Sequence, residues 1–360
     1  MGKKIKRICF FSVGFAFNRE VRMKFYEKIF PKDVKIFLFT TNKYEGENFH
    51  KDYVLKKTKI FYSDYNFFKL PFVFRKFCKE NQIERVINIG CHSSGFILLF
   101  STIFSKRDYL LHILGDIFHL NKNNFFNRLK RFLDLLNLFP IILLSKKTIT
   151  GSFSDYQRFI HFLGEKKIKF LPGPVNTDLF KPKIRDEVRK KLNLSNNKKI
   201  AIYVGRLNYL KGFDILLNLI ERNPDILFIL IGKNEYPDFN KKNFNNVIYL
   251  PSIDNKKLVD YYNAADICLF LSRKEGFGFV PREAMSCGTP VLVSEIPSLK
   301  ILGPAITTPH NLDVVQKKLR NFFNLPKNKK KLISTKSRDY ILKECSEDSI
   351  KEDYQSVFLS

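Results

Sequence analysis

The chain of 360 residues is long enough for two domains, and its 44% of hydrophobic residues excludes general disorder. The formal net charge of +28 favours an anionic partner, but it does not separate nucleic acid, anionic lipid and phosphorylated substrates. A compositional bias toward lysine and asparagine explains the same charge without any function. No helix-turn-helix, RNP or zinc-finger pattern occurs, so we expect no nucleic-acid partner.

The first residues have the basic and then apolar order of a signal peptide. The apolar run is short, however, and ends in the polar residues Asn18–Glu20 without a cleavage site, so a first strand is expected instead. No stretch has the length of a transmembrane helix. The six cysteines form no CxxC pair, which predicts reduced thiols in a cytoplasmic protein, without a zinc site or a disulfide framework.

Strand-like and helix-like segments alternate in the first half, a pattern typical of parallel sheets with crossover helices. Strands are expected at Ile8–Phe11, Val34–Phe39, Val86–Ile89, Tyr109–Leu114 and Lys147–Thr150. Two segments, Phe61–Phe77 and Phe125–Phe139, combine aromatic and aliphatic residues with bases. Such stripes suit an anionic membrane surface, although packing in a core explains them as well.

The proline-rich stretch Pro172–Pro182 is typical of a linker. Beyond it, strands are expected at Ile200–Gly205, Ile226–Gly232, Val247–Leu250, Ile267–Leu271 and Pro290–Val293. We therefore predict an α/β protein with domains at 1–172 and 183–338, a linker at 173–182, and a helix over Asp339–Phe358 within a C-terminal segment 339–360.

A glycine-rich loop, GRLNYLKG, separates the first strand of the second half from the helical pattern at Phe213–Glu221. A strand that ends at Gly205, a short loop and a new helix form a common anion site. Arg206 and Lys211 would add two positive charges to it. Solvated basic residues are the alternative for each of them alone.

The segment Glu275–Ser294, EGFGFVPREAMSCGTPVLVS, places two carboxylates eight positions apart around a glycine-rich turn. Gly276 and Gly278 allow the backbone to approach a bulky polar ligand, and Pro281 suits the first turn of a helix. Glu283 is expected in that first turn, where free amides face an anion. Taken singly, Glu283 is explained as a capping residue and Glu275 as a solvated one.

The two motifs, in this order, resemble the nucleotide-sugar signature of the retaining GT-B glycosyltransferases of family 4, the glycosyl transferases group 1. The resemblance implies two Rossmann-like domains facing a central cleft, and a nucleoside diphosphate sugar as donor. It implies that Arg206 and Lys211 bind the diphosphate, that Glu275 contacts the transferred sugar, and that Glu283 binds the ribose. It also implies donor contacts from Gly205, Gly276, Phe277 and Gly278, and a C-terminal helix that returns to the first domain.

The first domain departs from the family pattern. A single Gly14 replaces the usual Gly-Gly turn after the first strand. A histidine near the acceptor is common in the family, and His112, with Asp116 beside it, is the acceptor-side candidate, although a core histidine fits His112 as well. Ser152 or Ser154 matches a serine that opens a helix in relatives, for which N-capping is the plain explanation.

The sequence thus predicts a glycosyltransferase that moves a sugar to a hydroxyl of a glycan or lipid-linked acceptor, at the cytoplasmic side of a membrane. No Asp-x-Asp occurs, so we expect no metal ion and no cofactor. A sugar-nucleotide epimerase on the same fold and a non-catalytic basic relative are the alternatives. A nicotinamide-dependent dehydrogenase is disfavoured because no GxGxxG follows a strand.

Overall fold

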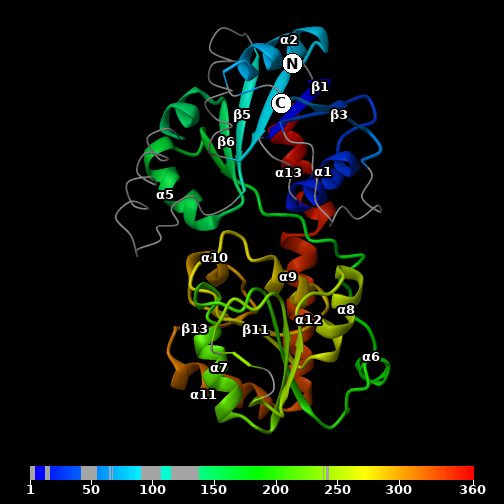
Figure 1. The fold of residues 1–360 in the computed structure, drawn as a ribbon, viewed down its shortest axis with the longest axis vertical. Coiled ribbons are helices and arrows are strands. Elements are labelled where there is room, and N and C mark those ends of the chain that lie inside the picture. The colour runs from blue at the N-terminus through cyan, green and yellow to red at the C-terminus, as the bar shows by residue number, and fades with distance from the viewer. Residues whose placement is uncertain are drawn as a thin grey trace. The chain divides into compact units, whose positions relative to one another are not determined.

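A computed structural model describes residues 5–12, 17–41, 55–64, 66, 68–90, 107–114, 138–237, 239–240 and 243–360. Within them the chain forms two compact units, Met1–Pro174 with Ile350–Ser360 and Val175–Ser349 (Figure 1). No helix in the described ranges is long and apolar enough to cross a bilayer. Gly14, Asp116 and residues 125–137 of the second aromatic-basic segment lie outside the described residues.

The first unit is built on a parallel sheet in the order β3-β2-β1-β4-β5-β6-β7. The strands are β1 (Arg7–Ser12), β2 (Lys35–Thr40), β3 (Thr58–Tyr62), β4 (Arg85–Ile89), β5 (Asp108–Ile113), β6 (Lys147–Thr150) and β7 (Ile168–Phe170). Both faces of the sheet are covered, which explains the nearly continuous apolar runs of its central strands. The five segments expected as strands in the first half are confirmed as β1, β2, β4, β5 and β6. The sequence analysis missed β3 and β7, because both are short edge strands with mostly exposed or half-buried residues.

The helices of the first unit divide between the two faces of the sheet. Helices α1 (Phe17–Ile29) and α13 (Glu347–Leu359) pack against one face, where Tyr26, Tyr354 and Phe358 share a core (Figure 1). Helix α2 (Leu70–Glu80), the helical residues 138–144 and α5 (Phe153–Leu163) cover the other face.

The second unit has the sheet order β10-β9-β8-β11-β12-β13, and every described strand pair in it is parallel. Its strands are β8 (Lys199–Val204), β9 (Ile226–Ile231), β10 (Val247–Leu250), β11 (Ile267–Phe270), β12 (Val291–Ser294) and β13 (Ile306–Thr308). Its helices are α6 (Arg185–Lys191), η1 (Tyr209–Lys211), α7 (Phe213–Arg222), α8 (Asn255–Ala264), α9 (Phe279–Ser286), α10 (Pro297–Lys300), α11 (Leu312–Phe323) and α12 (Lys327–Glu344). Two apolar clusters sandwich the sheet, as expected for a buried parallel sheet.

The expectation of one helix over Asp339–Phe358 is wrong, because α12 ends at Glu344 and α13 begins at Glu347. Cys345 leaves the helical conformation, with φ −140° and ψ 0°, and its carbonyl accepts a hydrogen bond from the Val175 amide at 2.9 Å. The Ser346 hydroxyl then accepts the Ser349 amide at 3.1 Å, as an N-cap does.

Candidate functional site

Three loops follow the carboxyl ends of neighbouring strands in the second sheet. Strands β9, β8 and β11 are neighbours and run parallel, so their carboxyl ends lie side by side. The loop after β8 (205–212) is called the first loop, and the loop after β11 (271–278) the second loop. The carboxyl ends of parallel strands are where α/β proteins bind ligands.

Two glycines make the close packing of these loops possible. Gly232 has φ +143°, and a Cβ there would lie 2.1 Å from the carbonyl oxygen of Gly205. Gly212 has φ +72°, and its Cβ would lie 2.0 Å from the carbonyl oxygen of Leu271. Any larger residue would therefore push the first loop away from its neighbours.

Lys211 and Glu275 form the contact between the first and the second loop. Lys211 Nζ lies 2.5 Å from Glu275 Oε2, and the two side chains are 22% and 20% exposed. The Asn208 side chain accepts the Lys211 amide at 3.0 Å, which caps η1 and fixes the lysine backbone. The structure thus brings together two residues, 64 positions apart in the chain, that the motifs singled out.

Arg273 ties the same loops together, and the sequence analysis missed it. Its guanidinium donates two hydrogen bonds to the Asp214 carboxylate, at 2.6 and 2.7 Å, and lies 3.7 Å from the ring centroid of Tyr209. Its amide donates to the Leu210 carbonyl at 2.9 Å. The stacking on Tyr209 and the amide contact join the two loops, and the bidentate pair fixes the second loop to the first turn of α7.

Arg206 does not join this pair. Its side chain is 57% exposed, and Nη1 lies 3.4 Å from Glu235 Oε2 in the loop after β9. Asn208 Nδ2 donates to the same Glu235 oxygen at 2.9 Å. Arg206 therefore lies in the same loop as Lys211, and its exposed side chain can turn toward a bound anion.

Arg282 of α9 holds the glycine-rich part of the second loop in place. This arginine is 1% exposed, donates to the carbonyls of Phe277 and Gly278, and lies 3.7 Å from the Phe277 ring centroid. The Glu275 carbonyl accepts the Ser298 hydroxyl at 2.7 Å. Burial lowers the pKa of Arg282, and no carboxylate pairs with it among the described residues. The sequence signal for this role was a basic residue within the largely apolar stretch VPREAM.

The expectation that Glu283 lies in the first turn of its helix is wrong. Gly278 adopts φ +75° as the N-cap, so α9 begins at Phe279 and Glu283 is its fifth residue. Glu283 is half-buried, and its carboxylate accepts a hydrogen bond from the hydroxyl of the fully buried Tyr262 at 3.1 Å. Burial of the carboxyl raises the pKa of Glu283 from 4.5 to about 7.

His112 is fully buried in β5, with both ring nitrogens occupied. Nε2 lies 3.2 Å from Arg22 Nη1, and Nδ1 lies 3.0 Å from the Tyr26 hydroxyl. Burial, with Arg22 adding to it, holds the pKa of His112 well below its usual range, so the ring is neutral. This geometry supports the core-histidine interpretation. The Ser152 hydroxyl caps α5 by accepting the Asp155 amide at 3.3 Å.

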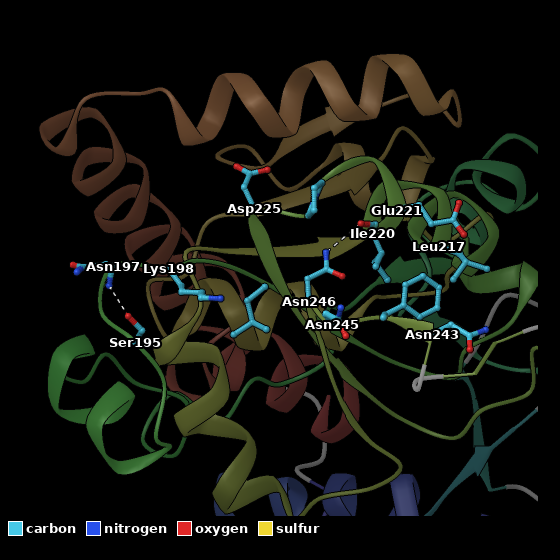
Figure 2. A pocket seen from close by; sticks show the side chains of 13 residues that line it. Ser195, Asn197, Lys198, Leu217, Ile220, Glu221, Asp225, Asn243, Asn245 and Asn246 are labelled. Carbon is cyan, nitrogen blue, oxygen red and sulfur yellow. Dashed lines mark hydrogen bonds between the residues drawn. The ribbon is translucent and has the colours of Figure 1, made fainter.

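A pocket on the second unit lies at the amino ends of the strands, away from the first and second loops (Figure 2). Lys198, Asp225 and Asn246, which line it, directly precede β8, β9 and β10. Asn246 Nδ2 donates to the carbonyls of Ile220, Asn223 and Ile226 at 3.1 to 3.2 Å, so this polar side chain stabilises the turns around it. In the described part of the chain, no three His, Cys, Asp or Glu side chains gather to hold a metal ion.

The first and second loops lie within residues 184–338, which match the family model "Glycosyl transferases group 1". This segment is a group 1 glycosyl transferase domain. Its Lys211–Glu275 pair and the arginines at 206, 273 and 282 all fall inside the match.

Bacterial proteins are among the curated relatives of this chain. The "Uncharacterized 41.2 kDa protein in cps region" of Klebsiella pneumoniae is 28% identical over 69% of this chain and 71% of its own length. The D-inositol 3-phosphate glycosyltransferase of Mycolicibacterium smegmatis is 29% identical over 39% of this chain. That alignment spans only 35% of the relative, about a third of its length.

Solved structures match both units of the chain. Sucrose-phosphate synthase from Thermosynechococcus elongatus aligns with a TM-score of 0.78 at 19% identity, over 98% of each chain. Anabaena HepE, solved in complex with UDP and glucose, aligns with a TM-score of 0.74 at 15% identity, over 98% of this chain and 99% of its own. The predicted α/β class and GT-B fold are confirmed.

Proposed function

We propose that this protein transfers a sugar from a nucleoside diphosphate sugar to a hydroxyl of an acceptor. The observation that carries the proposal is the Lys211–Glu275 pair, which joins the two motif loops at the ligand-binding edge of a group 1 glycosyl transferase domain. Anabaena HepE was also solved with UDP-glucose, which supports a hexose donor of this type.

The bases of the first loop would act on the departing diphosphate. As the bond between the anomeric carbon and the phosphate oxygen breaks, its electron pair goes to the diphosphate, and Lys211 and Arg206 offset the added charge. The acceptor oxygen bonds to the anomeric carbon, and its proton passes to the departing phosphate. In this proposal the new bond forms on the face from which the phosphate leaves, so the configuration is retained.

The carboxylates of the second loop and of α9 would hold the donor on either side of its diphosphate. When Lys211 turns to the phosphate, it releases Glu275. The Glu275 carboxylate then accepts hydrogen bonds from hydroxyls of the sugar. The amides of Phe277 and Gly278 complete that contact, and Glu283 accepts hydroxyls of the ribose. Gly205 and Gly276 provide close backbone approach.

The acceptor in this proposal is a glycan or a lipid-linked sugar in the synthesis of a cell-surface polysaccharide or glycolipid. The relative "in cps region" and the inositol phosphate glycosyltransferases support an acceptor of that polar kind. We place the reaction in the cytoplasm, at the inner face of the membrane. The five described cysteines, which are free and buried, suit a reducing compartment.

Donor binding is tested by thermal shift with UDP-, GDP- and ADP-sugars, because a ligand that binds the folded state raises the melting temperature. The same donor, carrying a labelled sugar, is then offered with membrane extract as acceptor. Glu275→Gln should abolish transfer, while Glu221→Gln, an exposed change on α7, should leave it intact. No shift with any sugar nucleotide contradicts the proposal. Conversion of the donor without an acceptor would instead identify an epimerase.

A further inference from the structure

Three helical segments cover one face of the first sheet. Helix α2, the helical residues 138–144 and α5 each contribute to a single apolar cluster on that face, through Phe74, Ile142 and Phe159. Within that cluster Phe74 of α2 packs against Phe11 of β1 and Phe39 of β2, whereas α5 packs on β6 and β7. Their inner sides are therefore buried, and their outer sides all lie on the same side of the sheet.

Large exposed apolar side chains also occur in these helical segments and, with Phe68, in the turn just before α2. They are Phe68 (83% exposed), Phe72 (75%), Phe139 (54%), Leu143 (52%), Leu144 (58%) and Phe162 (84%). We call these six residues the outer apolar set. One exposed apolar residue is ordinary, but six large ones over a single layer are typical of an interaction surface.

Basic residues accompany the outer apolar set. Residues 68–80 hold four Lys/Arg and one Asp/Glu, residues 138–147 hold two and none, and residues 153–169 hold four and two. Lys76 is 78% exposed and Lys146 is 50% exposed. The layer therefore combines apolar side chains with an excess of positive charge, the chemistry that matches an anionic bilayer surface.

We propose that the outer side of α2, residues 138–144 and α5 is a docking surface for an anionic membrane. Phenylalanine and leucine side chains enter the interface between headgroups and acyl chains, and the lysines pair with lipid phosphates. The surface goes beyond the transfer reaction, because vesicle binding requires no donor. It would bring a lipid-linked acceptor to the first unit, and its failure would leave donor binding untouched.

The chain has no tryptophan, so a single introduced tryptophan reports one position. Phe72→Trp and Phe162→Trp place the reporter in the outer apolar set. Leu332→Trp is the matched control, since Leu332 is 53% exposed on α12 beside a run of lysines. Vesicles of phosphatidylcholine with phosphatidylglycerol should shift the emission of the first two reporters to the blue. An equal shift at Leu332, or none at Phe72 and Phe162, overturns the proposal.

Sedimentation with the same vesicles tests the binding itself. The triple variant Phe72→Ser, Phe139→Ser, Phe162→Ser should bind about tenfold more weakly or worse, whereas Leu332→Ser should bind like the natural chain. Half-molar salt or pure phosphatidylcholine vesicles should release the natural chain. Absence of binding at low salt contradicts the proposal. So does a triple variant that loses only self-association in light scattering, which would identify a second copy as the occupant.

Discussion

Lys211 and Glu275 neutralise each other across two loops, with 2.5 Å between the ammonium nitrogen and a carboxylate oxygen. The pair keeps the edge of the sheet compact before a donor arrives. It also means that a donor must replace one ion pair with two new sets of contacts, to phosphate and to sugar. The free energy of donor binding is therefore the gain from the new contacts minus the cost of breaking the ion pair.

Lys211→Ala should slow transfer by about 10- to 1000-fold, equivalent to about 1.4 to 4 kcal/mol, because the site loses one charged stabiliser of the departing diphosphate. Steady-state rates with the donor identified by thermal shift measure the effect. Lys343→Ala, a change at an 82% exposed lysine on α12, serves as control. Equal rates for Lys211→Ala and the natural chain would remove Lys211 from the mechanism.

Gly212→Ala should destabilise the second unit and reduce transfer, because the added methyl group would meet the Leu271 carbonyl and displace Lys211. Gly288→Ala is the control within the same unit, since Gly288 has a φ of +76° and the nearest atoms to the new Cβ lie at 3.7 Å or more. Each variant carries the conformational strain of about 1 kcal/mol, but only Gly212→Ala adds a clash. Similar losses of melting temperature would show that the close approach is unimportant.

Arg282→Leu should weaken donor binding and lower stability by about 1–3 kcal/mol, since the carbonyls of Phe277 and Gly278 lose a buried donor. Arg282→Lys keeps the charge but not the planar stacking on Phe277, so it should recover stability only in part. Arg282 is a positioning residue, and the informative measurement is KM against kcat. A rise in KM for the donor is expected for a displaced loop. Natural donor affinity in Arg282→Leu would contradict that role.

The raised pKa of Glu283 makes stability depend on pH. The folded state keeps this proton up to about pH 7 and the unfolded state loses it near 4.5, so the folded state binds more protons in between. The free energy of unfolding should fall as pH rises through this window, by up to about 3 kcal/mol in total, and level off above it. Glu283→Gln should remove that slope, which urea unfolding at pH 5, 6, 7 and 8 measures.

Donor binding should have the opposite pH dependence. Ribose hydroxyls donate to the ionised Glu283, so donor affinity should rise as pH rises through about 7. Tyr262→Phe removes a hydrogen bond that lowers the pKa of Glu283, and should move the midpoint of this rise to higher pH. A donor affinity that does not change between pH 6 and 8 would show that Glu283 does not contact the donor.

Transfer should persist in EDTA, because the proposed charge stabilisation comes from Lys211, Arg206 and backbone amides. Rates before and after dialysis against EDTA test this, with Mg²⁺ or Mn²⁺ added back. Loss of activity that either ion restores would assign a role to a metal ion.

The second unit was the more predictable part, because its buried strands appear as short apolar runs between turn signals. The limits of α9 were not predictable in this way, since the left-handed conformation of Gly278 decides where the helix begins. Arg273 could not be told from a solvated base in a chain with 63 lysines and arginines, and Arg282 differed from one only in the apolar residues near it in the sequence. Their contacts join residues that are distant in sequence or stack on a ring, and periodicity contains no information about either.

The first unit was harder to interpret. The pattern around His112 fits a site residue and a strand residue equally, and only its burial and its contacts with Arg22 and Tyr26 show that its side chain is interior. The edge strands β3 and β7 lack the apolar pattern on which strand prediction rests.

The first unit takes its last helix from the far end of the chain. Tyr354 and Phe358 are completely buried against Tyr26, and the Arg85 guanidinium donates to the Phe358 carbonyl at 3.0 Å. A fragment cut after Pro174 would therefore expose a hollow that these rings fill, while residues 175–349 keep both of their own clusters. Ribosomal synthesis has the same consequence, since the first unit completes its core only after the whole second unit has been made.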